Sequence, residues 1–187
     1  MQTMIRRGKR MAQHGFTLVE LLIVAIILAV LAAIVIPQFS SSTVDAKEAA
    51  LDADLTVMRS AIELYRAQHG GSFPGAKVSS GVTCTVGTAG AGAVNTSDAL
   101  RDQLTRYSNA AGGTCTGADP LTVLGPYLRK GIPAEPITGS TAIAVVNAGT
   151  PLAPAAATGG WTYDTVTGQI VMNSNALDSK GAAYSTH

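Results

Sequence analysis

The chain has 187 residues, a formal net charge of +1 and a mean hydropathy of +0.26, values that allow one ordinary domain together with one strongly apolar segment. Four of its 13 basic residues lie between positions 6 and 10, and all 12 acidic residues come later, so the remainder of the chain is net acidic. A net acidic domain has no electrostatic reason to bind nucleic acid broadly, and we expect no nucleic-acid partner.

An apolar run, residues 16–36, follows the basic cluster, and only Thr17 and Glu20 interrupt it. It meets the roughly 20 residues that a membrane-spanning helix needs. Because basic residues beside a span stay in the cytoplasm, residues 1–15 are predicted to be cytoplasmic and residues 38–187 extracytoplasmic. A cleaved secretory signal is the alternative, but the run exceeds the roughly 7 to 15 residues of a signal core, and no clean cleavage site closes it.

A second helical pattern continues beyond Pro37, where apolar residues recur at helical spacing with charged residues between them. The apolar members are Val44, Leu51, Leu55, Met58, Ile62 and Tyr65. We predict an amphipathic helix over residues 38–70 that ends at the glycines after His69, with its stripe against a core rather than in a partner's groove. A proline inside the combined helix cannot donate its backbone hydrogen bond, so a kink or local weakness is expected at Pro37.

Residues 72–120 form a variable region between this helix and the C-terminal part of the chain. Its glycine-rich stretch, residues 86–92, lacks the lysine and spacing of a phosphate-binding loop, which favours a flexible loop. Residues 97–107 combine a capping serine with apolar residues at helical spacing, which predicts a short helix. Cys84 and Cys115 are the two cysteines, and an extracytoplasmic pair favours a disulfide; two free thiols are the alternative.

Three strands are predicted after this region, at residues 142–147, 160–164 and 169–173, and a short glycine-containing connection makes the last two a hairpin. Apolar residues of the hairpin alternate with polar ones, which predicts that one sheet face meets the helix. These residues are Trp161, Tyr163, Ile170 and Met172. The expected fold class is α+β, with a long N-terminal helix packed on a small antiparallel sheet within residues 140–175.

The sequence shows no recognisable constellation of catalytic residues, and we expect the protein not to be an enzyme. Of the histidines, His14 precedes the apolar run, His69 lies at the expected helix end and His187 is the last residue. These positions give no histidine-based nucleophile and no metal pair at a working spacing. We therefore predict that the protein has no cofactor.

The string Gly-Phe-Thr-Leu-Val-Glu, from Gly15 to Glu20, followed by a continuous apolar helix, resembles the processing motif of type IV prepilins and of the pseudopilins of type II secretion systems. The resemblance implies that a membrane-embedded prepilin peptidase cuts between Gly15 and Phe16 and methylates the new amino terminus at Phe16. The family also usually carries a helix-interrupting proline, and Pro37 lies at that place.

Looser similarities to the major pseudopilin occur within residues 62–74, 124–133 and 160–168. The resemblance therefore implies a pilin-like fold and a structural subunit of a type II secretion pseudopilus, polymerised through its N-terminal helix to support protein secretion. The implied partners are other copies in a helical homopolymer, minor pilins or pseudopilins, an inner-membrane platform protein and an assembly ATPase. A type IV pilus subunit for adhesion, motility or DNA uptake is one alternative, and a single-pass membrane-tethered enzyme or binding module is another.

Major pseudopilins often carry a calcium site near the C-terminus, which directs attention to the oxygen-bearing side chains there. This chain offers Asp164, Asn173, Asn175 and Asp178. Their spacing matches no recognisable calcium-binding loop, and solvated surface acids are the alternative interpretation that we favour.

Glu20 needs a partner, because an isolated carboxylate in hydrocarbon costs about 3 kcal/mol. Cleavage after Gly15 creates an amine close to this carboxylate, and in a filament the amine of a neighbouring subunit is the expected partner. Glu20 is therefore expected to be an assembly determinant. The alternative is that its side chain snorkels to the cytoplasmic interface.

Overall fold

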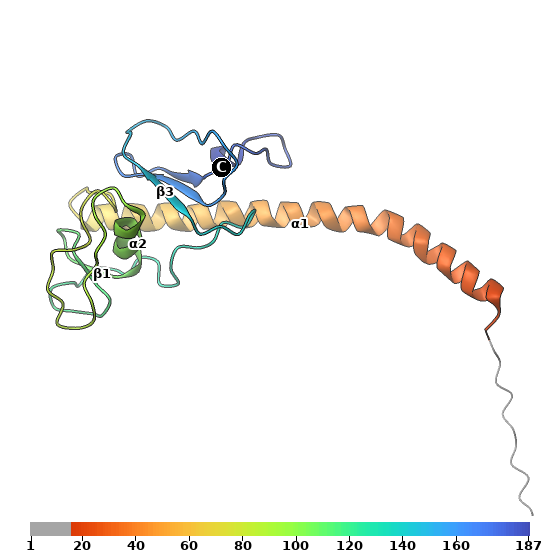
Figure 1. Ribbon diagram of the computed structural model, residues 1–187, viewed down its shortest axis with the longest axis horizontal. Helices are drawn as coiled ribbons and strands as arrows, with labels where there is room; N and C mark the ends of the chain where they lie inside the picture. The colour runs from red at the N-terminus through yellow and green to blue at the C-terminus, as the bar shows by residue number, and fades with distance from the viewer. Residues whose placement is uncertain (1–15) are drawn as a thin grey trace, which may run out of the picture. The chain divides into compact units, whose positions relative to one another are not determined.

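The computed structural model describes residues 16–187, apart from the side chains at positions 37 and 39–41. The chain divides into two compact units, one ending at Thr43 and one running from Val44 to His187. The predicted cleavage residue Gly15 lies outside the described residues. Helix α1 (Leu18–Gln68) is common to both units, and the other elements belong to the second (Figure 1).

The first unit presents the apolar start of α1. Its segment Leu18–Ile36 has a mean hydropathy of 3.2 and no buried share, and it is long and apolar enough to cross a membrane. Leu18 is 84% exposed and Ile36 is 68% exposed. The helical backbone continues through position 37, and the kink at Pro37 stays a prediction.

In the second unit α1 supplies the core stripe that its sequence pattern predicts. Leu51, Leu55, Met58, Ile62 and Tyr65 are each at most 1% exposed. Val44 was expected in this stripe but is 39% exposed, because the buried cluster begins only at Leu51. The helix ends as expected: the N–H of Gly71 bonds the carbonyl of Arg66 at 2.9 Å, with Gly70 and Gly71 at positive φ.

A three-stranded sheet with the order β3-β4-β5 packs against this stripe. Its strands are β3 (Ile143–Val146), β4 (Trp161–Asp164) and β5 (Ile170–Met172), close to the predicted ranges. The α+β class is confirmed, with one difference: β4 and β5 are antiparallel, but β3 and β4 are parallel. The tight turn after β4 reverses the chain, whereas the long connection after β3 carries the chain back to the end of the sheet at which β3 begins.

The predicted inward-facing residues of the hairpin are all in the core, but the other face of β4 and β5 is buried as well. The connection between β3 and β4 provides part of the reason. Within it, the N–H of Gly149 donates to the carboxylate of Asp164 at 2.9 Å, and the N–H of Leu152 donates to the side chain of Gln169 at 2.9 Å. The predicted face of the hairpin therefore meets the helix, and the opposite face of β4 and β5 is covered too.

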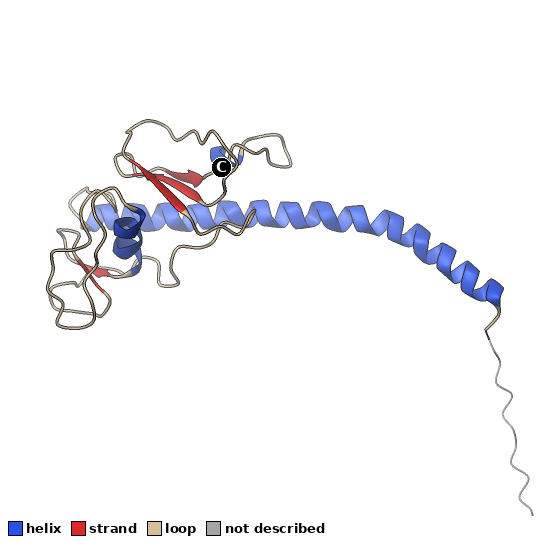
Figure 2. Ribbon diagram, in the orientation of Figure 1, coloured by secondary structure: helices blue, strands red, loops and turns tan. Residues whose placement is uncertain are grey.

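The variable region contains α2 (Ser97–Thr105) and a two-stranded ribbon of β1 (Tyr107–Ser108) and β2 (Thr114–Cys115), joined by loops (Figure 2). Helix α2 forms where the sequence predicts it, but its N-cap is Thr96 rather than the serine. The threonine hydroxyl accepts a hydrogen bond from the N–H of Ala99 at 3.2 Å.

Two buried side chains of α2 fix the loops of this region, including the end of the glycine-rich stretch that was expected to be a flexible loop. Asp102 accepts a hydrogen bond from the hydroxyl of Ser79 at 2.7 Å, and that hydroxyl in turn accepts from the N–H of Gly92. The amide of Gln103 accepts from the N–H of Gly75 and donates to the carbonyl of Gly112. These bonds satisfy backbone groups that the loops would otherwise bury unpaired.

Cys84 and Cys115 form a disulfide, in agreement with the sequence-based expectation, with their Cα atoms 5.8 Å apart. The bond closes a loop across 31 positions and ties the glycine-rich segment to β2. In the chain-entropy account such a loop contributes about 3 to 4 kcal/mol to stability.

Candidate functional site

The described chain begins at Phe16, whose side chain is 75% exposed, and α1 follows two residues later. Thr17 and Glu20 form a reciprocal pair at this helix start. Glu20 accepts hydrogen bonds from the N–H of Thr17 at 3.1 Å and from its hydroxyl at 3.0 Å. The N–H of Glu20 donates back to the hydroxyl of Thr17 at 3.2 Å. This is a capping box, in which two backbone donors at a helix start are satisfied by two side chains.

The capping box gives Glu20 a role that the sequence-based reasoning missed. The signal was present, because Thr-x-x-Glu before an apolar run is the pattern of a capping box. The same bonds supply part of the hydrogen bonding that a carboxylate at the edge of an apolar segment needs. They leave the negative charge of Glu20 without a cation within the described residues.

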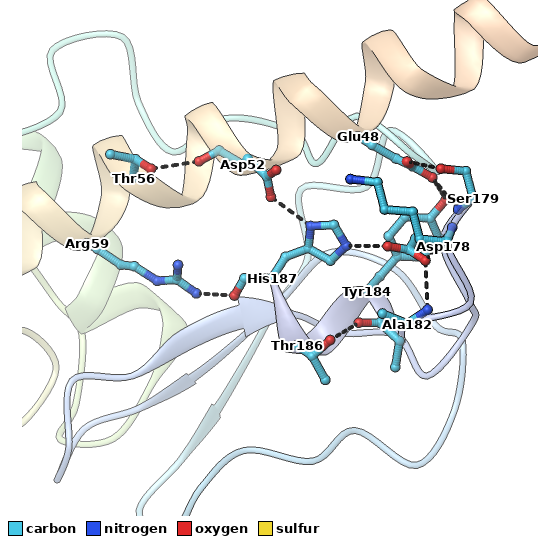
Figure 3. Close-up of polar contacts among 12 residues, drawn as sticks. Glu48, Asp52, Thr56, Arg59, Asp178, Ser179, Ala182, Tyr184, Thr186 and His187 are labelled. Atoms are coloured by element: carbon cyan, nitrogen blue, oxygen red, sulfur yellow. Dashed lines mark hydrogen bonds and ion pairs between the residues drawn. The ribbon is translucent and has the colours of Figure 1, made fainter.

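A second polar site lies where the segment 174–187 meets the side of α1 (Figure 3). Glu48 is 7% exposed, and its carboxylate accepts from the N–H of Ser179 at 2.8 Å, from the Ser179 hydroxyl at 2.6 Å and from the Tyr184 hydroxyl at 3.2 Å. The Ser179 hydroxyl and N–H stabilise the carboxylate, and they hold the pKa of Glu48 below its ordinary value.

His187 lies between two carboxylates in the same site. Its Nδ1 is 2.7 Å from Asp52 Oδ1, and its Nε2 is 3.2 Å from Asp178 Oδ2. Only a protonated imidazole donates from both ring nitrogens, so the charged ring satisfies both contacts at once. Arg59 adds a further bond, from its guanidinium to the backbone carbonyl of His187 at 2.7 Å. We call Glu48, Asp52, Asp178 and His187 with these bonds the C-terminal clamp.

Asp178 is buried in the clamp, with a side chain 4% exposed. Burial opposes its charged form, but the N–H groups of Ala182 and Lys180 and the His187 ring outweigh burial and lower its pKa. A groove of about 310 Å³ lies beside the clamp. It is lined by Asp45, Glu48, Ala49, Asp52, Lys180 and His187.

Three of the four side chains considered for calcium, Asp164, Asn175 and Asp178, are engaged in other contacts. Asp164 accepts from the N–H groups of Gly149 and Val166, at the turn between β4 and β5, whereas Asp178 belongs to the clamp. Within residues 16–187 no group of three or more His, Cys, Asp or Glu side chains is arranged to hold a metal ion. Among the described residues the other histidine is His69, which is buried and stacked on Tyr65 with ring centroids 3.6 Å apart, and burial lowers its pKa.

Comparison with known proteins bears on the N-terminal site. The prokaryotic N-terminal methylation motif matches residues 10–36. A type II secretion system core protein G from Pseudomonas aeruginosa is 38% identical over 58 residues, which are 31% of this chain and 41% of that protein. Over these residues the chain is similar to N-terminally methylated, pilin-like proteins. A core protein G from Klebsiella michiganensis is 31% identical over 58 residues, again 31% of this chain and 41% of the relative.

The chain thus matches less than half the length of these curated relatives. No solved structure matches it significantly. The motif match covers the last residue of the basic cluster and the apolar segment, whereas the C-terminal clamp lies outside residues 10–36. Sequence reasoning missed the clamp, because its members come from α1 and from a segment more than a hundred residues later.

Proposed function

We propose that this pilin-like protein is a structural subunit of a type II secretion pseudopilus, polymerised through its N-terminal helix to support protein secretion. The observation that carries the proposal is the segment Leu18–Ile36, which is strongly apolar and has no buried share. An apolar surface of this size needs a lipid or protein cover. A bilayer covers it in the single subunit, and the helices of neighbouring subunits cover it in a filament.

Processing prepares the subunit for that change of surroundings. In this proposal a prepilin peptidase cuts between Gly15 and Phe16 on the cytoplasmic side, and Phe16 becomes the methylated amino terminus. Before assembly the protein spans the inner membrane once, with residues 1–15 in the cytoplasm and the domain from Val44 on outside it. The basic residues within positions 6–10 support this orientation.

Glu20 links processing to assembly. The amine of a neighbouring subunit meets the charge of Glu20, while the capping box with Thr17 keeps the carboxylate oriented at the helix start. Such a pair adds little net stability once desolvation is counted. Leaving one member unpaired costs about 3 to 5 kcal/mol, so the pair selects the correct register between subunits.

The work of assembly comes from partners that the pilin-like family implies: an inner-membrane platform protein, an assembly ATPase and minor pseudopilins. Both curated relatives named above carry the name of a type II secretion system core protein, which supports the pseudopilus over an adhesive or motile pilus. A membrane-tethered enzyme would require a convergent polar site. The C-terminal clamp does not provide one, because its carboxylates already bond side chains and backbone groups of the same chain: Glu48 bonds Ser179, and Asp52 and Asp178 bond His187.

The test is electron microscopy of filaments sheared from cells that produce the full chain, with peptide mapping of the purified filaments. The proposal expects thin filaments made of this protein, starting at methylated Phe16, and loss of protein secretion when the gene is deleted. Filaments whose loss abolishes adhesion or motility but leaves secretion intact would move the protein to the pilus. Absence of the protein from every filament would overturn the proposal.

A further inference from the structure

The second half of α1 presents two flanks, one on each side of its buried stripe. At about 100° per residue, Asp45, Ala49 and Asp52 project to one flank, and Asp54 and Val57 project to the other. Each flank borders a groove. The first groove is the one beside the C-terminal clamp, and the second has a volume of about 410 Å³.

The first flank is acidic. Asp45 is exposed and forms no side-chain hydrogen bond or ion pair within residues 16–187. Asp52 bonds the His187 ring, yet its side chain remains 60% exposed. Lys180 is the one lysine that lines this groove, and its ammonium pairs with no carboxylate in the described chain. We call this surface, the groove with Asp45 and Asp52, the acidic flank.

The second flank is apolar and rimmed by cations. Its groove is lined by Asp54, Val57, Tyr127, Leu128, Arg129, Lys130, Gly131 and Pro133. Arg129 and Lys130 are exposed, and within the described residues neither side chain forms an ion pair or a hydrogen bond. Val57, which also lines the groove, is 55% exposed. We call this surface the basic flank.

We propose that the acidic flank of one subunit binds the basic flank of the next, with Asp45 and Asp52 facing Arg129 and Lys130. The occupant is a second copy of this chain, because Asp45 on the acidic flank and Arg129 and Lys130 on the basic flank have no partner of opposite charge within the described residues, while Asp52 stays 60% exposed beside His187. Each flank also carries one residue of the opposite sign, Lys180 on the acidic flank and Asp54 on the basic flank. These two residues lie on opposite sides of the proposed contact, so their charges also attract. This inference rests on the proposed filament.

The arrangement of the two flanks determines the kind of assembly. They lie on roughly opposite sides of α1, so the contact is heterologous and cannot close between two subunits. Their centres on α1 are about seven residues apart, and a rise of 1.5 Å per residue offsets them by about 10 Å along the helix. Parallel neighbours therefore meet with a step of about 10 Å, and repetition of that step produces an open filament.

A charge swap in the full chain tests the contact. Lys130→Glu and Asp45→Lys should each lower the yield of sheared filaments at least about tenfold, because like charges then face each other. The two changes together should restore at least half of the normal yield, since the pair is re-formed with reversed signs. Arg101→Glu is the matched control, because Arg101 is also exposed and unpaired in the described residues but lines neither groove.

Cysteine cross-linking provides a second readout. Filaments that carry Asp45→Cys with Lys130→Cys should give a ladder of linked subunits on a non-reducing gel after mild oxidation, whereas each single variant should give none. The native cysteines do not interfere, because they are bonded to each other. The steady-state level of the full-length subunit, measured in the same cells, shows whether any variant fails to fold.

The outcomes separate the inference from the function on which it rests. If the unchanged chain forms no filaments, the proposed function is overturned. Normal filaments from the unchanged chain, from Lys130→Glu and from Arg129→Glu with Lys130→Glu would overturn the flank contact and leave the filament intact. The contact would also be overturned if the double variant, Asp45→Lys with Lys130→Glu, reached the normal cellular level but gave a filament yield as low as that of the single variants.

Discussion

Thr17 and Glu20 bond each other reciprocally at the start of α1, with the Glu20 carboxylate 3.1 Å from the Thr17 nitrogen and 3.0 Å from its hydroxyl. One carboxylate therefore has two tasks, because it caps the helix and carries the charge that the proposed neighbouring amine would meet. A substitution that keeps one task and removes the other can separate them.

Glu20→Gln keeps an acceptor for the capping box but removes the charge, whereas Glu20→Leu removes both. If the charge directs assembly, both variants should span the membrane and be processed normally, and both should lose most of their filament yield. Thr17→Val is the matched control, because it weakens the cap and keeps the charge, at a cost of about 1 kcal/mol to the helix start. Normal filaments from Glu20→Gln alone would assign the role of Glu20 to the cap.

Processing can be read directly from the mature amino terminus. We expect membrane-extracted protein to begin at Phe16 and to carry a methyl group on its terminal amine, as mass spectrometry of the intact chain would show. Gly15→Val should leave an uncut precursor, because the peptidase acts after the glycine. Gln13→Ala, two residues earlier, is the control and should be cut normally. A mature chain that starts near Ala33 would identify an ordinary secretory signal instead.

The Cys84–Cys115 bond should stabilise the second unit without being required for its fold. Its chain-entropy contribution of about 3 to 4 kcal/mol corresponds to a lower melting temperature on reduction, by roughly 6 to 16 °C. Calorimetry of the detergent-solubilised full chain with and without reductant measures this, and the Cys84→Ser, Cys115→Ser double variant should no longer respond to reductant. Quantitative alkylation of both thiols in the unreduced native protein would show that the bond is absent.

The sequence was sufficient to predict the parts of the fold that local patterns determine. The long helix, its glycine end and the last two strands follow from apolar spacing and turn residues, and the structure has them within a few residues of the predicted bounds. The parallel pairing of β3 with β4 did not follow, because the direction of a strand after a long connection depends on tertiary packing.

Buried polar side chains account for most of what was missed. Asp102, Gln103 and Asp119 each bond backbone groups of loops that lie outside their own element, and such partners leave no periodic signal. Asp119 illustrates the point: hydrogen bonds from the hydroxyl of Thr85 and from nearby N–H groups lower its pKa to about 2. Thr17 was a different case, because its capping pattern could be recognised from the sequence alone.

The C-terminal clamp should make the attachment of the segment 174–187 sensitive to acid. Hydrogen bonds from Ser179 lower the pKa of Glu48 in the folded state, so this contribution to stability is present above the ordinary carboxyl pKa and is lost as the pH falls through the lowered value. Hydrogen exchange of the full chain should therefore show Ser179 and Tyr184 losing protection on acidification, before the core residues of α1 do.

Glu48→Gln provides the matching test at neutral pH. The amide keeps the shape of the side chain, but its nitrogen cannot accept the hydrogen bonds that Ser179 and Tyr184 donate to the carboxylate. We expect the N–H of Ser179 to exchange faster in this variant at neutral pH. We also expect acidification to cause little further loss of protection at Ser179, because the variant has no carboxylate to protonate at this position. Glu63→Gln is the control, because Glu63 is exposed and pairs only with Arg66 within the described residues. Equal protection of Ser179 in both variants would show that residues other than Glu48 hold the segment on α1.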